Sequence, residues 1–250
     1  MPLNPTVLFD ARIYYASLDA TGFSNKIELA ATVDDEDKTN FASGGWKERV
    51  GGLADTTATA SMFWQATDLT FPDDVLWAQL GTSTQPLTVA PTSGAVNTLC
   101  YLTRTLESQY KIGADVGKLL MAEATWGGNQ ALARGLILHP QGTARTSSGN
   151  GTGVQFTAGP TVAQRMYANL HVLSIAGTAS PTLTVTIQSS VDNTFASPTT
   201  RISFTAATAL GGQAASVLGA VTDTWWRAVW TISGTNPSFL FAVSAGVAAK

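Results

Sequence analysis

The segment 23–66 constrains the fold more than any other part of the chain, because two strand patterns flank a charged connection in it. A period of two residues is typical of a strand with one buried face, and both patterns show it. The first pattern places Ile27, Leu29, Ala31 and Val33 on one face and Lys26, Glu28, Ala30 and Thr32 on the other. The second places Thr57, Thr59, Ser61 and Phe63 opposite Ala58, Ala60, Met62 and Trp64.

The connection between these strands, Asp34–Arg49, is longer than a compact hairpin needs. Long ordered loops are usually functional, and this one concentrates charge. Its candidate contact residues are Asp34, Asp35, Glu36, Asp37, Lys47 and Arg49. The carboxylates could bind a hard cation, but they lack the ligand alternation and turn glycine of an EF-hand loop. Pairing with Lys47 or Arg49, in the same loop or a neighbouring subunit, explains them better, and we expect no metal.

Charge is sparse elsewhere. Charged residues make up 12% of the chain, about half the usual share for a soluble domain. Small and β-branched side chains take up much of the difference, and they suit pleated surfaces that pack against other protein. An assembly subunit is therefore favoured over an ordinary low-charge β protein. The net charge of −3 argues against a nucleic-acid reader with a basic face.

The charge is also uneven along the chain. Residues 1–145 hold ten basic and fifteen acidic side chains, a net −5, whereas residues 146–250 hold four and two, a net +2. The single cysteine, Cys100, cannot form an intrachain disulfide, so we expect no oxidised framework. The N-terminal residues lack the pattern of a signal peptide, and no apolar run is long enough to span a membrane. These features predict a protein made in the cytosol.

Strand signals dominate the rest of the chain, and the predicted fold class is all-β. We expect one helix in the segment 71–82, where Asp73 and Asp74 lie in the first turn and Gly81 follows the last. A break rich in Gly, Ser and Thr follows the front strands. We therefore predict a β sandwich or barrel over residues 1–145, a flexible linker at 146–153, and a second β-sandwich, of jelly-roll or immunoglobulin-like type, over 154–250. Predicted strands are 7–16, 25–33, 56–66, 85–90, 98–108, 117–126, 131–139, 168–173, 182–188, 201–205, 224–233 and 239–244.

The chain nominates no catalytic site. His139 and His171 are isolated in strand-like contexts, whereas a zinc site needs clustered ligands. No nucleophile elbow, phosphate loop, dinucleotide fingerprint or zinc-protease motif is present. We therefore expect no enzyme activity and no cofactor.

Two side chains near the C-terminal end form a candidate contact surface. In a strand, Trp225 and Arg227 share one face, so Arg227 could stack on Trp225 as a cation–π pair. An exposed Trp225 could also be a platform for a sugar ring. A structural role for this surface is favoured over sugar binding.

The front half resembles the major tail (tail tube) proteins of long-tailed bacteriophages. The likeness rests on FSNKIELAATVDDEDKTNF and WKERVGGLADTTATASMFWQ, with a further segment, IGADVGKLLMAEATWGGNQALARGLIL, similar to later strands of that family. The matching residues are Val33, Asp34, Asp37, Thr39, Phe41, Arg49, Gly52, Leu53 and Asp55. The pair Val50–Gly51 departs from the family pattern, in which the corner before Gly52 is less rich in glycine.

The resemblance implies a structural virion protein. Such subunits form rings, usually hexameric, that stack into a hollow tube through which genomic DNA passes without specific binding. Partners would be further copies of the chain and other tail proteins: the tape measure, the tail terminator and the baseplate or tip. Assembly would take place in the host cytoplasm, and the 34–49 connection would reach the adjacent ring. An acidic lumen would repel phosphate.

The rear half is similar to accessory β domains of phage structural proteins, through LHVLSIAGT, LTVTIQSSVDNTF and TWWRAVWTISGTNPSF. It could decorate the tube, brace neighbouring rings or contact sugars on the host surface. Two alternatives to a tube subunit stay open at this point: a carbohydrate-binding or adhesin module, and another virion component such as a capsid decoration protein or a tail-completion protein.

Overall fold

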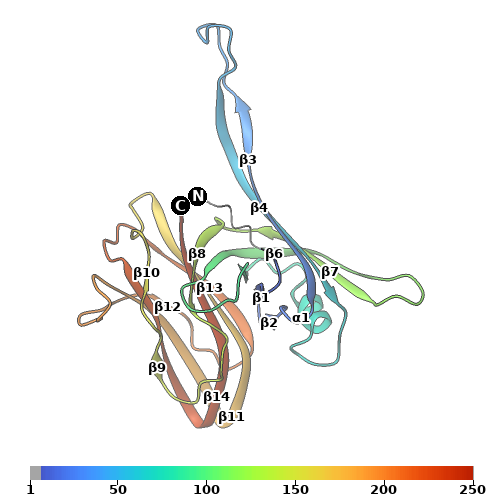
Figure 1. The fold of residues 1–250 in the computed structure, drawn as a ribbon, viewed down its shortest axis with the longest axis vertical. Coiled ribbons are helices and arrows are strands. Elements are labelled where there is room, and N and C mark those ends of the chain that lie inside the picture. Colours follow the sequence, from blue (N-terminus) through green and yellow to red (C-terminus); the bar gives the residue numbers. More distant parts are fainter. Residues whose placement is uncertain (1–6, 250) are drawn as a thin grey trace.

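The computed structural model describes residues 7–249. Residues 1–6, part of the segment examined above for a signal peptide, and Lys250 lie outside the described residues. Within the described range the chain is all-β, as predicted: fourteen strands join into one connected sheet, accompanied by a single short helix (Figure 1). No helix in this range is long and apolar enough to cross a membrane.

The element bounds are β1 Arg12–Tyr15, β2 Leu18–Asp19, β3 Ser24–Asp37, β4 Arg49–Phe63, α1 Pro72–Gln79, β5 Gln85–Ala90, β6 Leu99–Gly113, β7 Met121–Gly128, β8 Ala133–His139, β9 Gly149–Asn150, β10 Val154–Gln155, β11 Gln164–Ser190, β12 Thr199–Ser203, β13 Gly211–Leu218 and β14 Trp225–Ala249.

The front half, residues 7–145, is built around β6. One end of β6 pairs with β5 and β8, and the other pairs with β7, which continues through β4 to β3. The predicted alternation of β4 is confirmed, because Ala58, Ala60 and Met62 are buried in the core with Trp126 of β7. The core also takes Val75 and Leu76 of α1 with β1, β2 and β5. This packing fixes the root of β4.

The rear half, residues 146–249, is a long two-stranded ribbon of β11 and β14 that folds on itself. We predicted five strands in the rear half. The strand at 201–205 overlaps β12, but the other four are not separate, because they lie within β11 and β14. The glycines and prolines taken as turns lie at register shifts inside the ribbon, where positive φ angles at Gly177 and Gly234 let it bend. The sequence pattern also missed β13, which pairs with the first part of β11.

The two halves share backbone pairing. β14 pairs with β8 through Val243–Val247, and β8 pairs with β6, so the sheet runs without a break from the rear half into the front half. The segment 146–153 carries β9, which pairs with β14, and the carbonyl of Ser147 accepts a hydrogen bond from Trp230 Nε1 at 3.0 Å. The division into two domains joined by a linker stays a prediction.

A buried polar network also joins the halves. His171 Nδ1 lies 3.0 Å from the carbonyl oxygen of Ala16, and a carbonyl only accepts, so Nδ1 carries the proton. His171 Nε2 therefore accepts from the Thr88 hydroxyl, 2.9 Å away. The same hydroxyl oxygen lies 3.0 Å from Ser244 Oγ and 3.3 Å from Asn169 Nδ2. Burial lowers the pKa of His171 to about 4, which keeps the ring neutral at pH 7.

The network predicts that Thr88→Val destabilises the protein. The substitution keeps the shape but leaves buried partners without a hydroxyl, which costs about 1–3 kcal/mol. Denaturant unfolding should show this loss in the free energy of unfolding. Thr178→Val is the matched control, because the hydroxyl of Thr178 is exposed and bonds at 3.4 Å. Equal effects of the two substitutions would contradict a network that holds the halves together.

Candidate assembly interface

The β3–β4 hairpin projects from the body as a two-stranded ribbon (Figure 1). We predicted a loop over Asp34–Arg49, and most of its acidic residues instead lie in strand. Asp35 pairs with Gly51, Glu36 with Val50, and Asp37 with Arg49. Both faces of the ribbon are in solvent at this point, so charged side chains extend the strands without a burial cost. The true loop, residues 38–48, is called the hairpin tip below.

The apolar face of β3 leaves the body after Leu29. Ile27 and Leu29 are half-buried against the front core, as the period predicts. Ala31 and Val33 continue the same face but are exposed, and Val33 is 60% exposed. The sequence pattern predicted one buried face along the whole strand, and it is wrong beyond Leu29 because nothing in the described chain covers that face.

Large apolar side chains stand in solvent along the projection. The two most exposed at the tip are aromatic, Phe41 at 111% and Trp46 at 80%. On β4, Leu53 is 81% exposed and Val50 is 52% exposed. Exposed apolar groups gathered on one feature mark an interaction site. The hairpin is therefore the best candidate for a contact surface.

The structure brings the candidate charged residues of the hairpin together in pairs. Arg49 forms an ion pair with Asp35, and Lys47 Nζ lies 3.7 Å from Asp37 Oδ2. The pKa of Asp37 is lowered, chiefly by hydrogen bonds from Thr39 and also by Lys47. These pairs are exposed, and such pairs contribute little to stability.

Asp34 and Glu36 are the acidic residues of β3 that have no basic partner in the described residues. Within residues 7–249 neither forms an ion pair. Both side chains lie beside Gly52, where an added Cβ would meet Asp34 Cβ at 3.0 Å and Glu36 Cγ at 3.1 Å. They therefore give one face of the hairpin an uncompensated negative charge.

The pair Gly51–Gly52 is not a corner but part of β4. Between the pairs Val33–Ala54 and Asp35–Gly51 the register shifts, with one residue on β3 opposite two on β4. Such a bulge bends and twists a ribbon and re-aims its side chains. An added Cβ at Gly51 would also come within 3.2 Å of Val33, which favours glycine there.

The hairpin tip is held by its own hydrogen bonds. The Lys38 amide donates to the Glu48 carbonyl at 3.0 Å, and the Glu48 amide donates to Thr39 Oγ1 at 2.9 Å. Gly44 and Gly45 take φ angles of 63° and 86°, in the left-handed region that favours glycine. Phe41 and Trp46 are therefore presented by a defined turn.

Sequence analysis missed a second projecting hairpin, formed by β6 and β7 (Figure 1). Its connection, residues 114–120, is exposed throughout, and Val116, Leu119 and Leu120 are 106%, 70% and 40% exposed. The sequence did carry a sign of this exposed connection, because three large apolar residues flank Gly117 and Lys118, which are typical of a turn. We had placed the start of a strand there instead.

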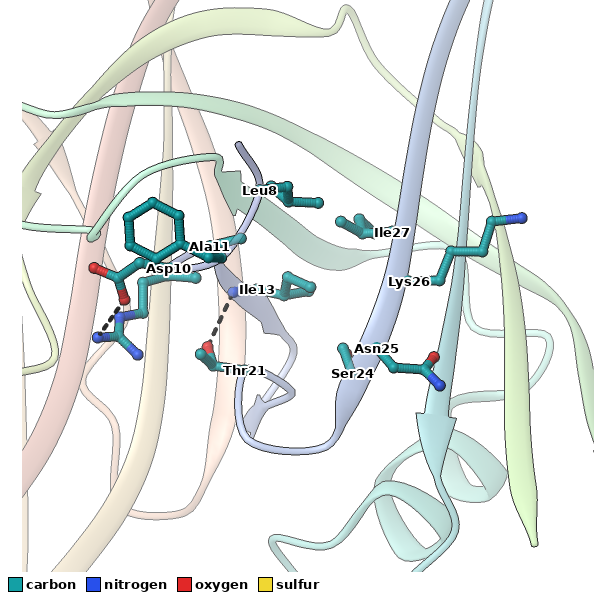
Figure 2. A pocket seen from close by; sticks show the side chains of 11 residues that line it. Leu8, Asp10, Ala11, Ile13, Thr21, Ser24, Asn25, Lys26 and Ile27 are labelled. Atoms are coloured by element: carbon teal, nitrogen blue, oxygen red, sulfur yellow. Dashed lines mark hydrogen bonds and ion pairs between the residues drawn. The ribbon is translucent and has the colours of Figure 1, made fainter. Parts of the chain in front are cut away.

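A pocket of about 180 Å³ lies at the root of β3, between that strand and the N-terminal segment (Figure 2). Its charged groups are already paired: Arg12 with Asp10 at 3.2 Å, and Lys26 with Glu28 at 3.0 Å. The Ile13 amide donates to Thr21 Oγ1 at 3.1 Å across it. These contacts are typical of a structural joint.

The remaining candidate groups are buried. His139 stacks on Phe241, with ring centroids 4.5 Å apart, and burial lowers its pKa to about 4. Burial also raises the pKa of the Cys100 thiol. No group of three or more His, Cys, Asp or Glu that could hold a metal ion occurs in residues 7–249.

Trp225 and Arg227 lie side by side on β14 but do not stack on each other. The Arg227 guanidinium sits 4.3 Å from the centroid of the Phe195 ring and donates to Gln188 Oε1 at 2.9 Å. Trp225 is half-buried between β11 and β10. Their role as a contact surface stays a prediction.

No protein-family model and no curated protein matches the chain. The chain matches solved structures at low sequence identity, among them the following three. The chain is 14% identical to one in a native gene transfer agent virion, over 50% of this chain and 95% of that one, with a TM-score of 0.40. It is 12% identical to a chain of the six-fold symmetrised anti-feeding prophage baseplate, over 53% and 97%, with a TM-score of 0.39. It is 10% identical to the Dit protein of phage SPP1, a hub adsorption protein, over 95% and 99%, with a TM-score of 0.36.

Glu107 of β6 is a buried acid that sequence analysis missed. Its side chain is 0% exposed and lies beside Tyr15 and Trp126. Burial is the main cause that raises its pKa to about 8. A buried group without an open cleft is structural, and it should make stability depend on pH.

We predict that the contribution of Glu107 to stability falls as pH rises towards 8. The unfolded chain loses this proton near pH ~4.3, and the folded protein keeps it until about pH 8. The unfolded state therefore binds fewer protons in that window, so the free energy of unfolding falls with pH. Between about pH 6.5 and 8 this contribution falls by about 1.5 kcal/mol. The lowered pKa values of His139 and His171 act in the opposite direction, because the unfolded chain binds more of these protons, and they offset part of the loss in the wild type.

Glu107→Gln should remove this loss, so that the free energy of unfolding of the variant falls less with pH than that of the wild type, or rises, as measured by denaturant unfolding at the two pH values. Glu123→Gln is the matched control, because that side chain is exposed and pairs with Lys111. An unchanged slope in Glu107→Gln would show that Glu107 is ionised in the folded protein.

Proposed function

We propose that the protein is a structural subunit of a bacteriophage tail that assembles with copies of itself into rings, and that the rings stack into the tail tube. The projecting β3–β4 hairpin is the observation that carries this proposal. A two-stranded ribbon is marginally stable in water, and from Ala30 to Asp55 this one is exposed apart from half-buried Ser43 and Glu48. Contact with another copy would cover the apolar side chains that the monomer leaves in solvent.

The free strand edges supply a ring contact. In the described residues β3 pairs only with β4, so its outer edge carries unpaired backbone groups along its length. β4 pairs with β7 only from Thr57 onward, which leaves the edge of residues 49–56 open as well. Such edges accept a strand from another chain. A neighbouring copy that pairs here would continue the front sheet around a ring.

The asymmetry of these features favours a ring over a closed dimer. The outer edge of β3 and a strand edge elsewhere on the chain are different surfaces, so their contact is heterologous. Heterologous contacts generate rings when the rotation closes. The front-half charge of −5 suits a lumen wall that repels the phosphates of passing DNA, because DNA binding grows with each neutralised phosphate. The proposed role is structural, without catalysis.

Deleting Thr39–Gly45 should leave the monomer folded and block the stacking of rings. The segment is exposed except for half-buried Ser43 and makes hydrogen bonds only within the hairpin tip and its neighbouring strand ends. Circular dichroism and thermal unfolding should match the full chain. Negative-stain electron microscopy, at high concentration after long incubation, should show hollow stacks for the wild type and single rings for the deletion.

In a second variant, residues 39–45 are replaced by Gly and Ser. This variant keeps the length of the loop and removes only its side chains, and its rings should also fail to stack. Wild-type rings that never stack would contradict the tube and fit a component present as one ring. Monomers alone would contradict self-assembly. Normal stacks from the deletion variant would remove the role assigned to the tip.

A further inference from the structure

The chain that follows α1 is attached to β6 at Glu107. The Gly81 amide donates to the Glu107 carbonyl at 2.9 Å, and the Glu107 amide donates to the Thr82 carbonyl at 3.4 Å. Leu80 and Glu107 also form an isolated parallel bridge. The main chain of Glu107 therefore holds the C-terminal end of the helix, while its side chain is fully buried beneath the surface.

A second contact joins α1 to β6 three residues further along the strand. Tyr110 donates its hydroxyl to Asp73 Oδ1 at 2.6 Å, and Trp64 Nε1 donates to the same oxygen at 2.9 Å. Burial is the main cause that raises the pKa of Tyr110, and the neighbouring Asp73 and Glu107 add to it. Tyr110 is thus a neighbour both of the acid on α1 and of the buried acid on β6.

α1 is too short to be stable by itself. It has eight residues, and Phe71 at its N-cap makes no side-chain hydrogen bond. Isolated helices of this length are marginal in water. The packing that supports it comes from Val75 and Leu76, which are buried in the front core. Whether α1 stays in place therefore depends on its contacts with β6 and that core.

The Glu107 carboxyl has no cation to compensate it. Its titratable neighbours are Tyr15 of β1 and Tyr110 of β6, with Asp73 of α1 beyond Tyr110, and β7 supplies Trp126. β5 contains no titratable residue, and those of β4 are exposed. Within residues 7–249 Glu107 forms no ion pair. An ionised carboxylate here is buried without a partner, which is costly.

The backbone is interrupted at the same place. Glu107 lies opposite Trp126 and Gln109 lies opposite Thr125, so Ser108 is the extra residue of a bulge between β6 and β7. A bulge disrupts the ladder locally. The pairing of β6 with β5 and β8 lies before the bulge. Movement next to Glu107 therefore leaves the centre of the sheet paired.

We propose that Glu107 is a pH-sensitive switch for α1: its protonated side chain keeps the helix on β6, and its ionisation favours a detached helix. Detachment admits water to the carboxylate and breaks only the contacts described above. It also exposes Val75 and Leu76, so the apolar surface that the subunit offers changes with pH. The inference concerns the fold of one subunit and does not rest on the proposed function.

The direction of the effect follows from the two states of the helix. With α1 in place the pKa of Glu107 is about 8, whereas a solvated glutamate has a pKa of ~4.3. The detached state binds fewer protons between these values, so detachment becomes easier as pH rises towards 8 and levels off above it. Between about pH 6.5 and 8 the equilibrium constant for detachment should rise about tenfold.

Hydrogen exchange of the full chain at these two pH values, read by mass spectrometry and corrected for the intrinsic pH dependence of exchange, tests the switch. In the wild type, peptides covering residues 75–82 should be less protected than β5, and their protection should fall about tenfold at the higher pH. Low denaturant concentrations should leave this exchange unchanged, because a local opening exposes little surface. In Glu107→Gln the protection of residues 75–82 should be equal at the two pH values.

Two further variants separate titration from contact. Glu123→Gln, the matched control, removes an exposed acid and should behave as the wild type. Tyr110→Phe removes the contact with Asp73 and should lower the protection of residues 75–82 at both pH values, while the pH dependence remains. Protection of residues 75–82 that equals that of β5, that does not change with pH in the wild type, or that still falls with pH in Glu107→Gln would overturn the proposal.

Discussion

Backbone pairing by β14 is the constraint on which the rest of the structure depends. Along most of its length β14 pairs with β11, and through Val243–Val247 it also pairs with β8. β8 pairs with β6, and β6 carries β7, which holds the root of β4. The direction of the projecting hairpin is therefore set by continuous hydrogen-bonded ladders. A projecting contact element needs such a base, because a flexible joint would add an ordering cost to every contact it makes.

The hairpin itself balances two opposing demands. Exposed apolar residues and open edges invite strand addition by any chain, which is an aggregation hazard. Charged residues on the outer part of β3, from Asp34 to Asp37, oppose unselective pairing because like charges on adjacent strands repel. Phe41 and Trp46 lie beyond this charged stretch, on the ordered turn. The arrangement allows contact at the tip while discouraging random pairing along the ribbon.

Local patterns predicted strand existence well and strand ends poorly. The alternation of Ala58, Ala60 and Met62 identified the buried face of β4, because packing against the front core enforces a two-residue period. The same rule failed at Val33, since a projecting strand has no core to enforce burial. Gly177 and Gly234 suggested turns, although backbone bending inside a long ribbon needs the same φ angles. The charged residues of the hairpin were found from charge density, whereas Glu107 was missed because a lone acid in a strand pattern gives no sign of burial.

The two contact directions of the proposed assembly follow from one ribbon. Hydrogen bonds at a strand edge run perpendicular to the strand, so a neighbour that adds to the outer edge of β3 lies beside the subunit. The hairpin tip lies at the end of the same ribbon, so a copy that receives it lies along the strand direction. Lateral and axial contacts are thus nearly at right angles, which is the geometry that a stack of rings requires and that a closed dimer lacks.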